Sequence, residues 1–255
     1  MTTGLSVACE DGLVGVLTIQ RAPNNFFDLA LVQAIADAAH SLAQANTRAI
    51  VLRSEGKHFC AGADFTGAAT VEERMETTRQ VYAEAVRLFD VPVPIVAAVQ
   101  GSAVGGGLGL ACAADFRVAA PSSRFHANFS HLGIHQGFGL SESLPQIVGH
   151  QNALRLLCLG ERVSGDEARQ LGLVDVLVGD DELQPAAMRL AQSLSAAAPL
   201  AVRSIKQTLR GDLANRVRAI VEREVAEQGR LWATEDFEIG LAANLARQVP
   251  AFRGR

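Results

Sequence analysis

The spacing of apolar and polar residues along this 255-residue chain predicts a mixed α/β fold. Short apolar runs over 5–9 and 14–20 flank an Asp11-Gly12 turn, which is typical of a β-hairpin. Two further runs, over 49–54 and 95–100, are separated by a helical pattern, so this part should form a largely parallel sheet. Helical spacing is found over 29–45, 72–89, 186–197, 200–209, 216–232 and 235–246.

The last third of the chain is predicted to be mainly helical. Ser164-Gly-Asp-Glu167 has the spacing of a capping box, so a helix should begin there, end near Gly172 and lead to a strand over 174–178. From residue 182 onward the pattern is nearly all helical. We therefore expect a core over 1–195 and a C-terminal helical region over 196–255.

Two glycine-rich turns follow predicted strands. The strand over 95–100 runs into the triplet Gly105-Gly106-Gly107, where a helical pattern begins, and the strand over 49–54 precedes the turn over 58–64, which contains Gly62. Backbone N–H groups at the start of a helix lack an intrahelical partner, and glycine lets a ligand oxygen approach them closely. The triplet alone is more typical of a close-packed strand–helix junction, but the pair of turns predicts an oxyanion hole.

With these turns the chain resembles the crotonase, or enoyl-CoA hydratase/isomerase, superfamily. The resemblance spans residues 5–20, the turn around Gly62, and the blocks 101–115, 125–139 and 164–175. It implies an α/β fold built as a spiral of ββα units, with a C-terminal helical region that forms a homotrimer or hexamer. It also implies an acyl-CoA ligand, with coenzyme A as part of the substrate and no separate cofactor. The carbonyl of the thioester would be polarised by the N–H groups of Ala63 and Gly106.

The sequence departs from the family pattern at two positions. Where the hydratases carry two glutamates that hold and activate water, this chain has Gly109 and Phe129. Glycine cannot transfer a proton and phenylalanine excludes water, so the ordinary hydration apparatus is absent at both places. His135 and Gln136 are the candidate replacements: an imidazole suits proton transfer, whereas an amide could only orient a water or a carbonyl. The alternative is that both side chains only hydrogen-bond their own loop.

The resemblance also assigns contacts to the substrate. By position, the expected substrate-binding and CoA-binding residues are Arg21, Lys57, Ala61, Asp64, Phe65, Gly105 and Phe129. Lys57, one of only two lysines, would contact a CoA phosphate or simply be a solvated loop residue. Asp64 is more typical of a turn or cap residue than of a catalytic acid, and Asp28 is expected to cap the following helix.

Charge and composition exclude several other functions. A net charge of −4 and a pI near 5.9 argue against a nucleic acid or an anionic membrane as partner. Residues 91–114 carry no formal charge, but their prolines and glycines would break a helix, so no membrane span is expected. His131 and His135 are separated by Gly133 and lack an H-E-x-x-H pattern, so no metal site is expected.

Cysteine usage and the N-terminus bear on location and redox state. The four cysteines, Cys9, Cys60, Cys112 and Cys158, lie mostly in apolar runs and are expected to be buried thiols. The first residues show no secretory signal pattern, so a cytoplasmic protein is expected. Two functions then fit the sequence: an acyl-CoA enzyme with non-standard chemistry, or a catalytically silent protein that binds or senses acyl-CoA.

Overall fold

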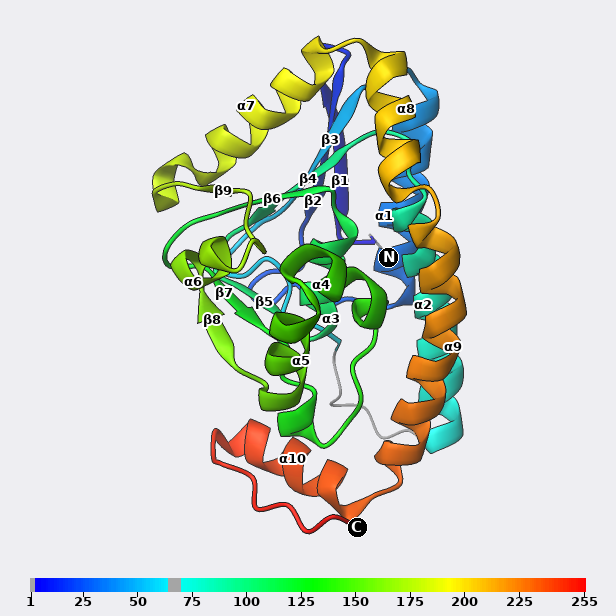
Figure 1. The fold of residues 1–255 in the computed structure, drawn as a ribbon, viewed down its shortest axis with the longest axis vertical. Coiled ribbons are helices and arrows are strands. Elements are labelled where there is room, and N and C mark those ends of the chain that lie inside the picture. Colours follow the sequence, from blue (N-terminus) through cyan, green and yellow to red (C-terminus); the bar gives the residue numbers. More distant parts are fainter. Residues whose placement is uncertain (1–2, 64–69) are drawn as a thin grey trace.

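The computed structural model describes residues 3–63 and 70–255 (Figure 1). Within these residues the main sheet has six strands in the order β1-β2-β3-β4-β6-β9. β1 and β2 pair antiparallel, and every other neighbouring pair is parallel, which confirms the hairpin and the largely parallel sheet. The strands of this sheet are β1 (Leu5–Glu10), β2 (Val14–Ile19), β3 (Ala49–Ser54), β4 (Ile95–Val99), β6 (Phe116–Ala119) and β9 (Val176–Leu177).

A second, three-stranded sheet has the order β5-β7-β8, and helices surround both sheets. Its strands are β5 (Ser102–Val104), β7 (Arg124–His126) and β8 (Arg162–Ser164). The first helices are α1 (Leu29–Gln44), α2 (Val71–Phe89), α3 (Gly106–Ala113), α4 (Leu140–Val148), α5 (His150–Leu159) and α6 (Gly165–Gln170). The later ones are α7 (Leu183–Ala196), α8 (Pro199–Arg210), α9 (Leu213–Trp232) and α10 (Glu235–Ala246), with short 3-10 turns η1 (Ser130–Leu132) and η2 (Asp180–Glu182).

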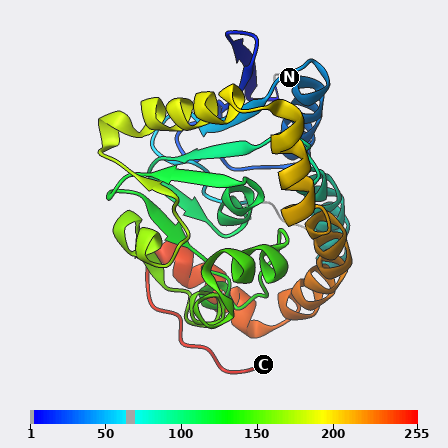
Figure 2. The ribbon, with the colours of Figure 1, turned by 45° about the horizontal axis from the view of Figure 1, so that its top comes forward.

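Both faces of the inner strands of the main sheet, β2, β3, β4 and β6, are buried. Side chains alternate along a strand, so each of these strands contributes to two packed layers. In β4, Val96 and Ala98 pack against Ala187 and its neighbours on α7. The alternate residues of the same strand join the larger core, which also holds the apolar face of α1. Figure 1 shows α7 on one side of the strands and α1 on the other, and Figure 2 shows α7 running along the sheet. Because both of its faces are buried, β4 is apolar at every position instead of alternating between apolar and polar residues.

Local capping explains where the predicted helices begin. Asp28 accepts a hydrogen bond from the Leu31 N–H at 2.8 Å, so it is the N-cap of α1 as expected. The Ser164 and Glu167 side chains form the expected capping box of α6. The helices of the C-terminal region follow the predicted spacing within a few residues. α9 runs beside α2, and α10 lies across the end of the molecule next to η1 (Figure 1).

Two expectations from the sequence are wrong. The strand expected over 174–178 is shortened to Val176–Leu177, because the Val174 N–H donates to Ala168 O in the turn that ends α6. Cys9 is exposed because the last four residues of the edge strand β1 are all exposed, and Cys158 is exposed because it lies on the solvent side of α5. Cys60 and Cys112 are buried as expected. Among residues 3–63 and 70–255, every helix is too short or too polar to cross a membrane.

Candidate active site

The Gly62–Ala63 peptide is oriented by its neighbour in the chain segment before α1. Phe27 donates its N–H to Gly62 O at 3.0 Å, and Ala61 donates its N–H to Asn24 O at 2.9 Å. In a planar trans peptide the C=O and N–H groups point in opposite directions. The Ala63 N–H therefore points away from Phe27, toward the side on which β5 and α3 lie.

The Gly105–Gly106 peptide is oriented by α3 in the same way. Gly105 O accepts the N–H groups of Leu108 and Gly109 at 3.0 and 3.2 Å, so this carbonyl points along the helix. The Gly106 N–H, on the same peptide, points out of the helix N-terminus, where the helix dipole favours negative charge. Gly105 itself donates its N–H to His126 O at 2.8 Å, which fixes the turn to β7.

The two turns pack directly against each other. Cys60 donates its N–H to Ser102 O at 3.1 Å and accepts from the Val104 N–H at 3.0 Å. A Cβ on Gly107 would lie 2.1 Å from Cys60 O, so only glycine allows this approach. A Cβ built on Gly62 would lie 3.9 Å from Gly106 N, so the second donor lies close to the first turn. Burial raises the pKa of the Cys60 thiol to about 12, so this cysteine is not a nucleophile at neutral pH.

Aromatic side chains cover the glycine turns. The Phe27 ring lies against the Cα of Gly106 and meets Phe138 edge to face, with the ring centroids 5.4 Å apart. The Phe129 ring lies beside Gly105 and is almost completely buried. The surroundings of the Gly106 N–H are therefore largely apolar, and in such surroundings a hydrogen bond to a developing charge is stronger than in water.

His135 and Gln136 lie on the loop between η1 and α4, which contacts α9 near the C-terminal end of that helix. The His135 Nδ1–H donates to Gln136 O at 2.8 Å, so the basic end of the neutral ring is Nε2. The Gln136 Nε2 amide donates to Ser141 Oγ at 3.1 Å. His135 O accepts from the Gln228 Nε2 amide at 3.0 Å, and Gln228 in turn pairs with the Tyr82 hydroxyl. The loop is thus anchored to both α9 and α2.

Comparison with known proteins decides the family. A sequence model described as enoyl-CoA hydratase/isomerase matches residues 10–255. The chain belongs to the enoyl-CoA hydratase/isomerase family. A probable enoyl-CoA hydratase of Bacillus subtilis is 32% identical over 249 residues, and the match covers 96% of each chain.

Solved structures agree with this assignment. An enoyl-CoA hydratase/isomerase from Pseudoalteromonas atlantica is 30% identical with a TM-score of 0.84, covering 98% of this chain and 100% of that one. An enoyl-CoA hydratase from Mycobacterium avium subsp. paratuberculosis is 26% identical with a TM-score of 0.85, covering 98% of both chains. The expected α/β crotonase fold and the expected enzyme type are thereby confirmed, and the C-terminal helices are present.

Gly109 and Phe129, the two positions at which the sequence resemblance led us to expect glutamate in a hydratase, are both packed with apolar groups. A Cβ on Gly109 would lie 2.6 Å from the Phe138 Cβ and 2.9 Å from its Cγ, so any side chain here would displace Phe138. Phe129, at the other position, is 6% exposed. The space beside Gly109 is therefore filled by Phe138, and the other position is occupied by a buried phenylalanine ring.

Replacing Gly109 with alanine is expected to destabilise the protein by about 1–2 kcal/mol. Because Phe138 is fully buried, overpacking against it should cost about 2–3 kcal/mol, the upper part of the usual range, and the gain in helix propensity returns about 1 kcal/mol. Urea unfolding of Gly109→Ala would measure the difference, with Gly179→Ala as control, because a Cβ at Gly179 would meet nothing within 4 Å. Equal stability of the Gly109 variant and the native protein would contradict the packing described above.

Some of the expected CoA-binding residues have defined surroundings in the structure, and others lie outside the described residues. The Arg21 guanidinium pairs with Asp28 at 2.8 Å and also donates to Thr3 O, so it already holds the N-terminal segment. Lys57 is exposed on the loop before the first glycine turn, and Ala61 is half-buried. Asp64 and Phe65 lie outside the described residues. A CoA contact by these residues stays a prediction.

Asn25 is one supporting residue that the sequence did not reveal. Its side chain is fully buried and donates to Glu55 O and His58 O at 2.8 and 2.6 Å, while its Oδ1 accepts the Arg21 N–H. Asn25 therefore ties the segment before α1 to the loop that leads into the first glycine turn. The Asn24-Asn25 pair after Pro23 is a turn signal, but nothing in the sequence says which loop it contacts.

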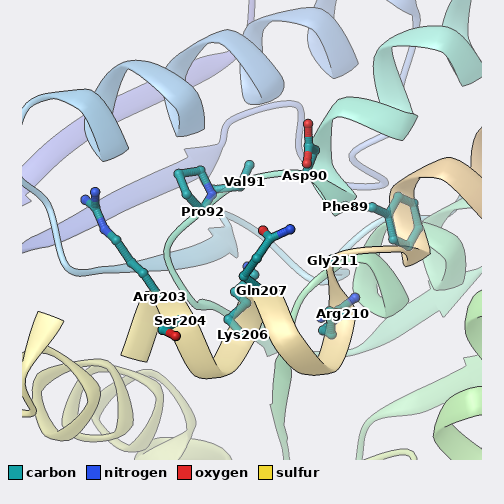
Figure 3. A pocket seen from close by; sticks show the side chains of 10 residues that line it. All are labelled: Phe89, Asp90, Val91, Pro92, Arg203, Ser204, Lys206, Gln207, Arg210 and Gly211. Atoms are coloured by element: carbon teal, nitrogen blue, oxygen red, sulfur yellow. The ribbon is translucent and has the colours of Figure 1, made fainter. Parts of the chain in front are cut away.

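One cavity lies away from the glycine turns. It has a volume of about 260 Å³ and lies between α8 and the connection from α2 to β4 (Figure 3). The basic side chains that line it are held by internal partners. Lys206 Nζ donates to Asp115 Oδ2 and Val93 O at 2.7 and 2.8 Å, and Arg210 Nη1 donates to Asp115 Oδ1 at 2.7 Å. This cluster fastens α8 to the sheet, and Asp115 is a structural acid.

Proposed function

We propose that this protein is an acyl-CoA enzyme that polarises the thioester carbonyl between the N–H groups of Ala63 and Gly106. The observation that carries the proposal is the orientation of the two peptides, since each carbonyl is bound on one side and each N–H is thereby turned to the other. One such donor typically contributes about a hundredfold to a thousandfold in rate. The charge placed on the thioester oxygen would favour the enolate of the acyl group.

Within this proposal, a residue of the loop before α4 transfers the proton of the carbon next to the thioester. With Nδ1–H bound to Gln136 O, the His135 ring presents Nε2 as the atom that takes a proton from, or returns it to, the carbon next to the thioester. An amide cannot transfer a proton, so Gln136 would orient the substrate. Because Gly109 and Phe129 cannot activate water, the reaction proposed is a proton transfer within the acyl group rather than the addition of water.

A catalytically silent acyl-CoA binder is the second candidate. The observation in its favour is the complete filling of the space beside Gly109 by Phe138, which leaves the glycine turns intact but removes the place of one family glutamate. Both candidates require acyl-CoA binding. They differ in whether any acyl thioester is changed by the protein.

A time course by mass spectrometry separates the candidates. The purified protein is incubated with a short enoyl-CoA and, in heavy water, with butyryl-CoA. We expect no addition of water to the enoyl-CoA and uptake of deuterium next to the thioester of butyryl-CoA. Addition of water would contradict the proposed loss of hydratase chemistry. Both thioesters returned unchanged, although bound, would favour the silent binder.

A homotrimer or hexamer belongs to the same proposal. α8 has no buried residue, and Leu200, Ile205 and Leu209 on it are 80%, 59% and 77% exposed. An exposed apolar stripe of this kind is typical of a surface that another subunit covers. Native mass spectrometry of the same sample would count the subunits, and a monomer would contradict this part of the proposal.

The buried thiols of Cys60 and Cys112 are free in the structure, which supports a reducing compartment and so the proposed cytoplasmic location. Fractionation of the source cells would test this.

A further inference from the structure

The cavity between α8 and the connection from α2 to β4 has two unlike walls. The connection contributes apolar side chains, those of Phe89, Val91 and Pro92 (Figure 3). The opposite wall is α8, which contributes Arg203, Lys206 and Arg210. These three positions are spaced by three and four residues, so they share one side of the helix. A cavity of about 260 Å³ is therefore apolar on one side and cationic on the other.

The positive charge around this cavity is incompletely balanced. Lys206 and Arg210 both pair with Asp115, so these two cations share one negative charge. Asp90, which also lines the cavity, is exposed to solvent. With Arg203 included, three cations face two carboxylates, and one positive charge is left over. The side chains of Lys206 and Arg210 are only 12% and 21% exposed, so solvent and salt screen this charge less than at the surface.

Arg203 is the cation that still has donors available. Its Nη2 group donates to Ala43 O at 3.0 Å and lies 3.5 Å from Thr47 O, both of them uncharged acceptors. Its Nε–H is buried, and among residues 3–63 and 70–255 it has no hydrogen-bond partner. A buried donor without an acceptor is costly, and a guanidinium offers its N–H groups as a fork that fits a carboxylate. An anionic ligand would therefore satisfy both the donor and the charge.

This cavity and the glycine turns lie at opposite ends of the main sheet. Val91 and Pro92 come before β4, and Asp115 comes before β6, so the cavity is at the amino ends of these strands. The two glycine turns follow the carboxyl ends of β3 and β4. A strand of five residues is about 16 Å long. A ligand in the cavity would thus be separate from a thioester bound at the two turns.

We propose that the cavity binds an organic monocarboxylate with a compact apolar body, the carboxylate on Arg203 and the body against Phe89 and Val91. One unbalanced positive charge matches a single carboxylate rather than the higher charge of a phosphate. The apolar wall favours a ligand with a carbon body over an inorganic ion, because apolar surface on both partners is removed from water. The inference goes beyond the proposed acyl-CoA function and concerns a second site.

The first test measures binding of three probes by isothermal titration calorimetry. Benzoate carries one carboxylate on a compact ring, benzamide keeps the ring without the charge, and inorganic phosphate keeps charge without the ring. We expect the native protein to bind benzoate with a dissociation constant of about 1 mM, an ordinary affinity for a ligand of this size. Benzamide and phosphate should each bind at least about tenfold more weakly, since each lacks one of the two matching features.

Charge variants of the cavity provide the second test. Arg203→Gln should abolish measurable benzoate binding. Because this variant also loses hydrogen bonds that hold α8, two exposed residues of the cavity are changed as well. Asp90→Asn removes a negative charge and should strengthen benzoate binding, whereas Gln207→Glu adds one and should weaken it, by about threefold to tenfold each. Arg189→Gln is the control, since Arg189 pairs with Glu182 at the surface of α7 and should leave the affinity unchanged.

The location of the probe is checked by repeating the benzoate titration with saturating butyryl-CoA, which should leave the affinity for benzoate unchanged. Displacement of benzoate by butyryl-CoA would overturn the inference, because it would place the probe at the thioester site. Absence of benzoate binding would overturn it too, as would equal affinity for benzamide or phosphate. Opposite shifts in Asp90→Asn and Gln207→Glu support the cavity as the site, and an affinity that neither variant changes would exclude it.

Discussion

Replacing Asp115 with asparagine is expected to destabilise the protein by about 3 kcal/mol, because it leaves two largely buried cations without their counter-charge. Lys206 and Arg210 each donate to the Asp115 carboxylate at 2.7 Å, and the side chains of Asp115 and Lys206 are only 9% and 12% exposed. The Ile95 N–H donates to the same carboxylate. Urea unfolding would measure the loss. The matched control is Asp212→Asn, since Asp212 pairs with Arg216 at the surface and should change stability by less than about 0.5 kcal/mol.

The pH dependence of the same variant supplies an independent check. Burial raises the pKa of Asp115, but the charges of Lys206 and Arg210 outweigh it and hold the pKa below its ordinary value of 3.8. A carboxyl whose pKa is lower in the folded state contributes stability above its unfolded pKa and loses it as the pH falls through the folded pKa. The stability difference between native protein and Asp115→Asn should thus narrow below about pH 4. A difference that stays constant down to pH 2 would contradict the charge cluster.

Replacing His135 with alanine is expected to slow deuterium uptake by butyryl-CoA in heavy water by about a hundredfold to ten-thousandfold, the range typical of a lost acid–base group. Affinity for butyryl-CoA should change little, because the donors of the glycine turns belong to the backbone. Exchange would be followed by mass spectrometry, and affinity by calorimetry. His131→Ala is the control, since His131 is exposed on η1. Unchanged exchange in His135→Ala would remove this residue from the proposed mechanism.

The backbone of the candidate site could be predicted from the sequence, whereas its side-chain supports could not. The glycines after β3 and β4 are local signals, because a turn that brings backbone donors close to a ligand demands residues without a Cβ. The long helices were equally predictable from their periodicity. The shortened strand β9 was not, because Val174 satisfies its N–H in the end of α6 rather than in the sheet.

Glu224 and Gln228 show what sequence reasoning missed. Both lie on the buried stripe of α9 that otherwise contains Val217, Val221, Val225 and Trp232. A polar residue at such a position requires a partner, so this interruption of the apolar stripe was the signal that could have found them. The partners themselves, Tyr82 and the loop before α4, are distant in sequence and are brought near only by the packing of α9 on α2 and α4.

The use of main-chain groups at the two turns has a consequence for how this protein can evolve. A single nucleotide change can replace a side chain of the loop before α4. Only proline removes a backbone N–H, and one nucleotide change can introduce proline at Ala63 but not at Gly106, because glycine and proline codons differ at two positions. If the proposed function is correct, lineages can therefore exchange the side chains that transfer protons while the backbone donors proposed to polarise the carbonyl persist. Substitutions that abolish function should accordingly be found more often at residues that orient the two peptides, such as Phe27 and Gly107, than at Ala63 and Gly106 themselves.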